Sequence, residues 1–250
     1  MKLLLISAFL PILAFAQLKN IGYKFTHNQM QSNKPYIEKY LLKITDTATF
    51  FYSENNQEQI FESSHNSSMA SGEIWNQLIV INNKKSFNIY DLIFTKEYSY
   101  SDTLNTIPWQ ILKDTASVLG KKCNVAKAFY RGHDWTAWFA PSIPCKYGPW
   151  ILNGLPGLIL RASADTNYMI FEAVSINEKV EYTPNIQEIK KTAIFTNHDA
   201  YIKERNYFNN NMMLYYQNDP LFKDTKDANG NPLFVYKGEE KVKRATYFEP

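Results

Sequence analysis

The sequence predicts a mainly β protein: a curved antiparallel sheet, or a half-open barrel, with one helix packed on it near the C-terminus. Tyr and Phe are abundant, with 17 and 16 residues, while Gly is scarce, with 9. Aromatic and β-branched residues favour strands. Short apolar or alternating runs also recur at close intervals between polar turns, which is the pattern of sheets built from hairpins. After Pro184 this pattern ends and a run at helical spacing follows.

The first half of the chain reads as strands joined by polar turns. Apolar or β-branched runs end at Ser/Asn/Lys/Pro-rich segments such as 32–35 and 82–85, and a longer Ser/Asn-rich loop covers 53–72. Such clusters are typical turn and loop signals. The strands expected here are 21–29, 36–45, 47–52, 78–81, 87–94, 95–100 and 109–112.

The second half continues the sheet and ends in a helix. Strands are expected at 124–130, 135–139, 158–162 and 168–176. The segment 140–157 holds four of the 11 prolines and should be irregular. Thr196 or Asn197 can cap a helix that runs to about Gln217, just before Pro220. The helix carries an aromatic and apolar stripe that should pack on the sheet, formed by Tyr201, Phe208, Met212 and Tyr215.

The N-terminus predicts export. Lys2 precedes a short apolar run that ends in Ala14-Phe15-Ala16 before Gln17, which is the pattern of a secretory signal peptide over 1–16. The apolar run is too short to span a bilayer comfortably. We therefore expect a single β-rich domain over 17–236 and a charged, mobile tail over 237–250, in the periplasm or outside the cell, with no membrane span in the mature chain.

Two cysteines, Cys123 and Cys145, are present. An even count in an oxidising compartment predicts a disulfide, worth about 3 kcal/mol on the chain-entropy model. Two cysteines alone make a poor metal site, and no metal-binding spacing occurs, so neither a metal nor a cofactor is expected. The basic residues are spread along the chain, which argues against nucleic-acid binding.

The least ordinary stretch is 148–160. It combines turn residues with large apolar side chains, Trp150 and Leu155 among them. Turns are normally polar because they lie in water, so this stretch is predicted to be a rigid element that faces inward. Its backbone shape should depend on a set of turn residues: Gly148, Pro149, Gly154, Pro156 and Gly157.

The hexapeptide Gly-Leu-Pro-Gly-Leu-Ile at 154–159 resembles the signature of the GLPGLI family, exported proteins of Gram-negative bacteria whose activity is unassigned. The resembling block covers about 119–176. The resemblance implies that this chain is an exported bacterial protein, and it does not indicate an activity. The sequence departs from the family pattern at His133 and Phe139. The upstream matches are Cys123, Ala126, Phe129, Arg131-Gly132, Ala137-Trp138, Ile143-Pro144 and Gly148-Pro149-Trp150.

Two groups are candidate sites. Arg131, His133 and Asp134 are the densest ionisable cluster of the block. Arg131 could contact an anion and His133 could carry a proton, or the cluster could be a solvated turn. An aromatic and apolar group could line a pocket for an apolar ligand, or it could be ordinary core. With Arg131, the candidate binding residues are Trp135, Trp138, Trp150 and Leu155.

The sequence contains no catalytic signature such as GxSxG, HExxH or SxxK. The first function predicted is therefore a non-enzymatic envelope protein that holds an apolar small molecule or a partner protein. The alternative is a hydrolase of unrecognised type that uses Arg131, His133 and carboxylates not yet identified, because catalytic groups can assemble from distant residues.

Overall fold

The computed structural model describes residues 20–28, 35–54, 77–82, 85–177, 179, 183–220 and 222–236. The predicted signal peptide over 1–16, the tail over 237–250 and most of the loop over 53–72 lie outside these residues. The limits of the 17–236 domain stay a prediction. Within the described part, no helix is long and apolar enough to cross a membrane.

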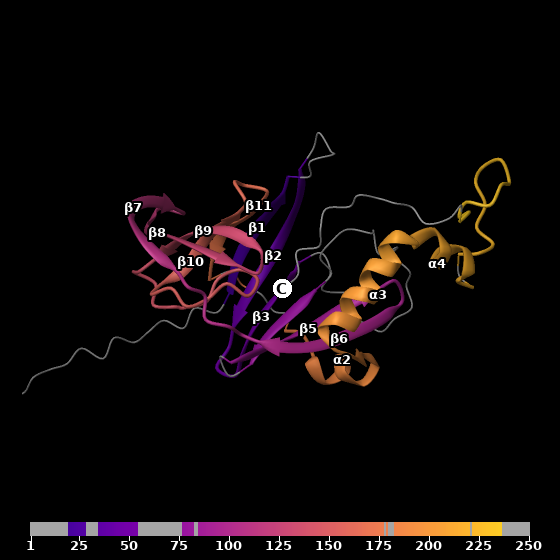
Figure 1. Ribbon diagram of the computed structural model, residues 1–250, viewed down its shortest axis with the longest axis horizontal. Helices are drawn as coiled ribbons and strands as arrows, with labels where there is room; N and C mark the ends of the chain where they lie inside the picture. Colours follow the sequence, from indigo (N-terminus) through magenta and orange to yellow (C-terminus); the bar gives the residue numbers. More distant parts are fainter. Residues whose placement is uncertain are drawn as a thin grey trace, which may run out of the picture.

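The structure is one large, open, strongly curved sheet (Figure 1), which confirms the predicted fold class. The predicted strands are all present with shifted ends. The strands are β1 (Asn20–His27), β2 (Tyr36–Ile44), β3 (Ala48–Ser53), β4 (Leu78–Asn82), β5 (Ser86–Ile93), β6 (Lys96–Thr103), β7 (Gln110–Val118), β8 (Lys121–Tyr130), β9 (His133–Ala140), β10 (Leu158–Ala164), β11 (Met169–Ile176) and β12 (Ile194–Phe195).

Two antiparallel meanders make up the sheet. β1 to β6 follow one another in order, and β11 back to β7 do the same. The two meanders join where β1 pairs antiparallel with β11. At the other side of β6 the two-residue strand β12 adds the one parallel pairing among the described strands.

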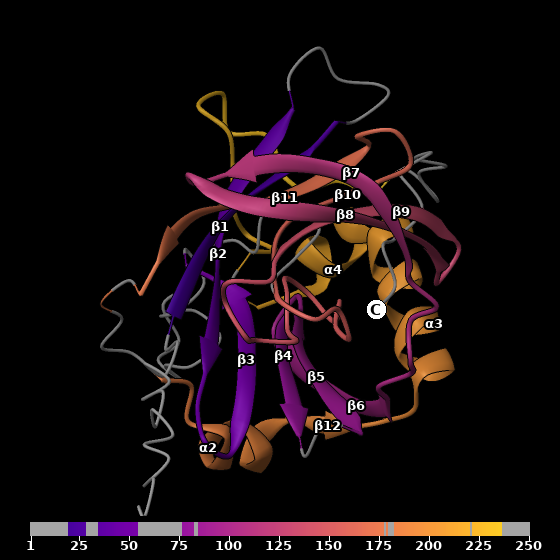
Figure 2. The same cartoon turned by 90° about the vertical axis from the view of Figure 1, so that its left-hand side faces the viewer.

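The connection from β6 to β7 requires the sheet to curl. β6 and β7 lie near opposite edges of the sheet, ten strand spacings apart in the order. A flat sheet would separate them by roughly 48 Å, at about 4.8 Å for each spacing. The six connecting residues, 104–109, can reach only about 25 Å. The two meanders therefore face each other across a concave interior, as Figure 2 shows.

Sequence reasoning ended β7 too early. It was predicted over 109–112, whereas the strand continues to Val118. β7 is the edge strand, and its pairing with β8 shifts register between Ile111 and Thr115. Lys113 and Asp114 lie at this irregularity, which breaks the alternation that sequence reasoning depends on.

Three described helices follow the sheet: α2 (Ile186–Thr192), α3 (His198–Asn210) and α4 (Met212–Asn218). Asn197 caps α3 as predicted, because its side chain accepts a hydrogen bond of 2.9 Å from the Ala200 N–H. The single helix predicted to Gln217 was too simple, since the chain leaves helical geometry at Asn211. The short helix α2 was not predicted.

The helix α3 is fastened to the sheet by a buried carboxylate. Asp91 on β5 is only 2% exposed. Its Oδ2 accepts hydrogen bonds from Tyr201 Oη and from Arg205 Nη2, both on α3. Gln77 Nε2 adds a bond of 2.9 Å to Tyr201 Oη. These hydrogen bonds hold α3 against β5.

The stretch 148–160 folds into the concave interior, as predicted. Trp150, Ile151, Leu152 and Leu155 are all buried in the main core. Gly157 cannot carry a side chain here, because a Cβ would lie 2.4 Å from the Ala140 carbonyl oxygen. Gly148 is equally restricted, since its Cβ would lie 2.7 Å from Ile159 Cβ. Pro149 and Pro156 lie in the same inward-folded stretch.

Two glycines of this stretch offer a matched comparison. Gly154 has φ +92° and open space where a Cβ would lie, whereas a Cβ on Gly157 would meet fixed backbone. We expect Gly154→Ala to cost about 1–2 kcal/mol of stability from backbone conformation alone. Gly157→Ala should cost a further 1–3 kcal/mol or so, because an overpacked backbone contact must be relieved. Urea unfolding of both variants measures the difference, and equal losses would contradict the inward-facing geometry.

The predicted disulfide is wrong for this structure, since Cys123 and Cys145 are both free thiols. Cys123 is buried on β8, where its Sγ donates to the Lys121 carbonyl oxygen at 3.5 Å. Cys145 lies in the irregular segment close enough to Tyr23 on β1 to interact with it electrostatically. The two thiols are therefore held in different surroundings. Burial raises the pKa of each thiol.

Candidate functional site

An ion pair joins the two facing meanders. Arg131 Nη2 lies 2.6 Å from Asp102 Oδ2. Asp102 is on β6, whereas Arg131 is in the turn between β8 and β9. In the order of the sheet, seven strands lie between β6 and β9: β5, β4, β3, β2, β1, β11 and β10. Arg131 has φ +47° and is followed by Gly132 at φ +79°, so a tight left-handed turn presents the guanidinium.

Two aromatic rings contact the Arg131 side chain in the concave interior. Its guanidinium carbon lies 5.5 Å from the ring centre of Phe87 on β5 and 5.8 Å from that of Tyr130. Arg131 Nε also donates to Tyr130 Oη at 3.4 Å. Stacking and hydrogen bonding of this kind limit the orientations open to a guanidinium.

The Asp102 carboxylate is held in its charged form. Burial by itself raises the pKa of Asp102, but the hydrogen bonds from Arg131 and the Thr103 N–H, with the Arg131 charge, outweigh it. The net result is a pKa below the ordinary value for aspartate. Thr103 N lies 2.6 Å from Asp102 Oδ1. Across the pair, Asp102 likewise raises the pKa of Arg131 against the opposing effect of burial.

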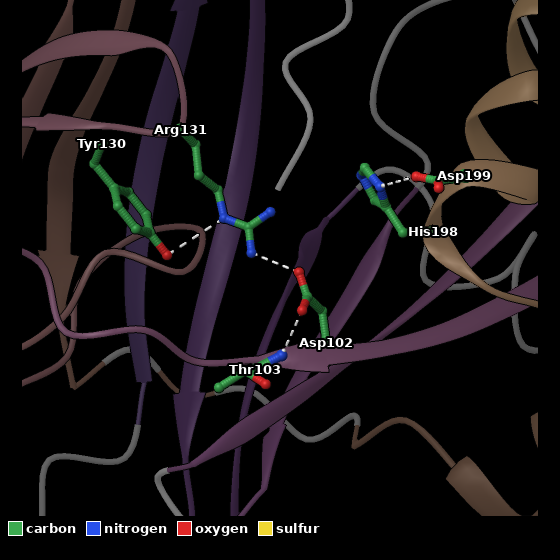
Figure 3. A network of polar contacts seen from close by, with 6 residues as sticks. All are labelled: Asp102, Thr103, Tyr130, Arg131, His198 and Asp199. Carbon is green, nitrogen blue, oxygen red and sulfur yellow. Dashed lines mark hydrogen bonds and ion pairs between the residues drawn. The ribbon is translucent and has the colours of Figure 1, made fainter.

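A histidine from a third element completes the cluster. His198 begins α3, and its imidazole interacts electrostatically with Asp102. His198 Nδ1 lies 3.3 Å from Asp199 Oδ1, and the ring packs against Tyr100 with ring centres 5.4 Å apart. Figure 3 shows side chains from β6, the β8–β9 turn and the start of α3 arranged around one region. We call Asp102, Arg131 and His198 the rim cluster.

His133, although two residues from Arg131, belongs to a different contact. Its Nδ1 pairs with Asp165 Oδ2 in the turn between β10 and β11. The same carboxylate accepts a hydrogen bond of 3.0 Å from the Asp134 N–H through Oδ1. The predicted ionisable cluster is therefore divided, with Arg131 joined to Asp102 and His133 joined to Asp165. His133 and Asp134 begin β9 instead of forming the turn.

The predicted aromatic group is also divided. Trp135, Trp150 and Leu155 are each 1% exposed and lie in the core. The rings of Trp135 and Trp150 stack with centres 5.6 Å apart. Trp138 is half-buried on the opposite face of β9, where the Arg161 guanidinium lies 4.6 Å from its ring centre. The alternation of side chains along a strand explains this separation.

A separate pocket lies between the β5–β6 turn and the α3–α4 corner. It has a volume of about 320 Å³ and is lined in part by Glu204, Tyr207, Tyr215 and Asp219. None of the predicted site residues lines it. Within the residues that the structure describes, no group of three or more His, Cys, Asp and Glu side chains could hold a metal ion.

Sequence reasoning found Arg131 but missed Asp102 and His198. Asp102 stands in an ordinary strand ending, Tyr-Ser-Asp-Thr, and His198 in an ordinary helix start, Asn-His-Asp. Their partnership arises from the curl of the sheet, which brings segments 29 and 67 residues away in sequence to Arg131. The one available signal was that each lies at the end of an element, where functional groups collect.

Comparison with known proteins gives one family. A family model described as the N-glycanase peptide, N-terminal domain, matches residues 34–202. Two crystal structures of PNGF-II, in space groups P21 and C2, share the fold with a TM-score of 0.53 at 16% sequence identity. The similarity covers 74% of this chain but 32% of each PNGF-II chain, so this chain spans about a third of their length. No curated protein matches.

The first function predicted from sequence is corrected by this match. A non-enzymatic envelope protein that holds an apolar ligand or a partner protein was expected, whereas the family model is that of an N-glycanase domain. The hydrolase alternative fits the comparisons better. The structural reason for the error is that the tryptophans taken as a ligand wall are largely packed core.

Proposed function

This chain belongs to the family of the N-glycanase peptide, N-terminal domain, and from that premise we propose that it is an exported hydrolase that acts on N-linked glycans. Export is supported by the signal-peptide pattern over 1–16, with cleavage between Ala16 and Gln17, which implies the periplasm or the exterior. The resemblance of 154–159 to the GLPGLI signature agrees with export and adds no activity.

The observation that carries the proposal is the rim cluster. It supplies an ionised carboxylate, an imidazole and a guanidinium from three separate elements. Hydrolysis needs a group that removes a proton from water, a group that returns a proton to the leaving atom, and positive charge or hydrogen-bond donors for the oxygen that becomes negative. The rim cluster contains an imidazole that can take and return a proton, a carboxylate that can accept a hydrogen bond from water, and a positively charged guanidinium.

Each residue of the rim cluster receives a role. His198 is the proton carrier, because imidazole is the most common side chain for general acid–base catalysis. Asp102, whose pKa is lowered by Arg131 and the Thr103 N–H, is held as a carboxylate and orients the water or a substrate hydroxyl as an acceptor. Arg131 is a positioning residue that keeps Asp102 ionised, and Figure 3 shows its guanidinium beside the Asp102 carboxylate.

The experiment compares variants of the rim cluster in a glycan-release assay on a denatured N-glycosylated protein. His198→Gln should lower kcat/KM by about 100-fold or more, the usual contribution of an acid–base group. Asp102→Asn, which removes the charged acceptor, should lower it by about the same factor. Arg131→Gln removes the charge that lowers the pKa of Asp102, so that pKa should rise. The acidic limb of the pH–rate profile should consequently move to higher pH.

A histidine outside the cluster provides the matched control. His133→Gln changes a histidine that is also paired with an aspartate, Asp165, but on the other side of the hairpin. Its kcat/KM should stay within about twofold of the parent, and thermal melts should show that every variant is folded. Equal losses in the His133 and His198 variants, or full activity in the Asp102 variant, would contradict the assignment.

A further inference from the structure

The pocket at the α3–α4 corner has a chemistry of its own. Its walls combine two tyrosines with carboxylates and one lysine, over an apolar base that includes Phe94 and Leu214. Tyr207 on α3 lines the pocket and is 48% exposed, so part of its ring is open to a ligand. The Tyr207 and Tyr215 rings lie at an angle of 64°, with centres 6.2 Å apart, which is an edge-to-face arrangement.

The polar groups of the pocket are fixed in position. Tyr215 Oη donates a hydrogen bond of 3.0 Å to Glu204 Oε1. Burial, and then the Glu204 carboxylate, raise the pKa of Tyr215 well above its ordinary value, so this hydroxyl remains a donor. Tyr98 on β6 also forms a hydrogen bond with Glu204. Glu204 is therefore an oriented acceptor that does not have to be ordered by a ligand.

The walls are rigid because one ring anchors the corner. Phe94 lies in the β5–β6 turn with φ +57°. Its ring contacts Phe208, Tyr215, Tyr216 and Phe222, at centre distances of 6.0, 5.7, 5.1 and 6.0 Å. The break at Asn211 allows α4 to turn over this ring, with Asn211 Nδ2 donating to the Tyr207 carbonyl oxygen at 2.9 Å.

We propose that this pocket binds one neutral sugar ring, and, resting on the proposed function, that the sugar is part of the N-linked glycan. A pyranose has an apolar C–H face that packs on an aromatic ring, and hydroxyls that donate to carboxylates. Tyr207 and Glu204 provide these two contacts side by side. At about 320 Å³ the pocket is at the small end of ligand sites, which suits a single ring better than a long chain.

The charge of the pocket selects among sugars. Glu204 and Asp219 carry negative charge and Lys96 carries positive charge, so the lining is negative overall. An acidic sugar would meet repulsion from the carboxylates, whereas a neutral N-acetylhexosamine would not. We therefore expect N,N′-diacetylchitobiose to bind and N-acetylneuraminic acid to bind more weakly.

The test is calorimetry and saturation-transfer NMR on the full chain with these two sugars as probes. Tyr207→Ala and Glu204→Gln should each weaken chitobiose binding by about tenfold. Glu204→Gln keeps the shape of the side chain. Phe129→Ala is the matched control, because Phe129 on β8 is a 65% exposed aromatic residue outside the pocket and its loss should leave affinity unchanged.

The outcomes separate this inference from the proposed function. Chitobiose binding that both pocket variants retain, or absence of binding to the parent, would overturn the sugar pocket whether or not glycan release is observed. Stronger binding of N-acetylneuraminic acid than of chitobiose would also overturn it. Binding that depends on Tyr207 and Glu204 supports the inference, even if the rim cluster variants show that no hydrolysis takes place.

Discussion

Trp150→Ala is expected to lower the free energy of unfolding by about 3–5 kcal/mol, the usual cost of removing a large buried aromatic side chain. Trp150 is 1% exposed and stacks on Trp135 with ring centres 5.6 Å apart. The Tyr130 ring also contacts Trp150 edge to face, with ring centres 6.3 Å apart. The indole thus links the inward-folded stretch to β9 and to the strand that leads into Arg131. Urea unfolding followed by circular dichroism measures the loss.

Trp138→Ala is the matched control for this prediction. Trp138 is on the same strand as Trp135 but is only half-buried, and the Arg161 guanidinium lies 4.6 Å from its ring centre. Its truncation should cost only about 1 kcal/mol, in the range of a partly exposed cation–π contact. If Trp150→Ala unfolds within 1 kcal/mol or so of the parent, the stretch 148–160 is not part of the core.

Asp91→Ala is expected to cost about 3–5 kcal/mol, because it removes the carboxylate that balances the charge of the mostly buried Arg205 guanidinium. Asp91 is 2% exposed, and its carboxylate accepts hydrogen bonds from both Tyr201 and Arg205. The lost stability should come from a weaker contact between α3 and the sheet. Denaturant unfolding gives the free energy, and hydrogen exchange of the α3 amides gives its location.

Two comparisons make the Asp91 prediction specific. Asp102→Ala removes the carboxylate of an ion pair that is partly open to water, with side-chain exposures of 18% for Arg131 and 34% for Asp102. It should cost less than about 1 kcal/mol. The double variant Asp91→Leu/Arg205→Met replaces the buried pair with apolar groups and should recover much of the loss. Equal effects of Asp91→Ala and Asp102→Ala would contradict the description of Asp91 as a buried tether.

The local structure was largely predictable because it depends on local signals. Period-two alternation and turn residues located the hairpins, and Asn197 located the start of α3. The burial of Trp150 was predicted because the stretch 148–160 combines turn residues with large apolar side chains, which turns exposed to water do not normally carry. Where the signals weaken, the prediction failed: β7 is an irregular edge strand, and α2 is a short helix with one buried residue, Ile189.

The site was much less predictable, because it is formed by the curl of the sheet. Sequence spacing placed His133 beside Arg131, but the turn geometry directs their side chains to different partners, Asp165 and Asp102. No local pattern links Asp102 or His198 to Arg131. The strand assignment from Trp135 to Phe139 was correct, yet a three-residue spacing in a strand puts Trp135 and Trp138 on opposite faces.

The cysteines show a further limit of composition-based reasoning. An even count and an exported chain predicted a bridge, whereas Cys123 and Cys145 are free thiols in the structure. Two cysteines can pair only if the backbone brings them together in a narrow range of distances. The fold places Cys123 in the strand β8 and Cys145 near Tyr23 on β1. An oxidising compartment was therefore not enough to predict a disulfide.

Glycan release by the parent protein tests the central proposal most directly. The purified exported chain is incubated with a denatured N-glycosylated protein in water enriched in ¹⁸O, and the products are weighed by mass spectrometry. We expect free glycan and deglycosylated protein whose masses show ¹⁸O taken up from the water, because hydrolysis transfers the oxygen of water to the cleaved bond. An unchanged glycoprotein mass, while an established N-glycanase removes the glycan from the same substrate, would contradict the proposed function.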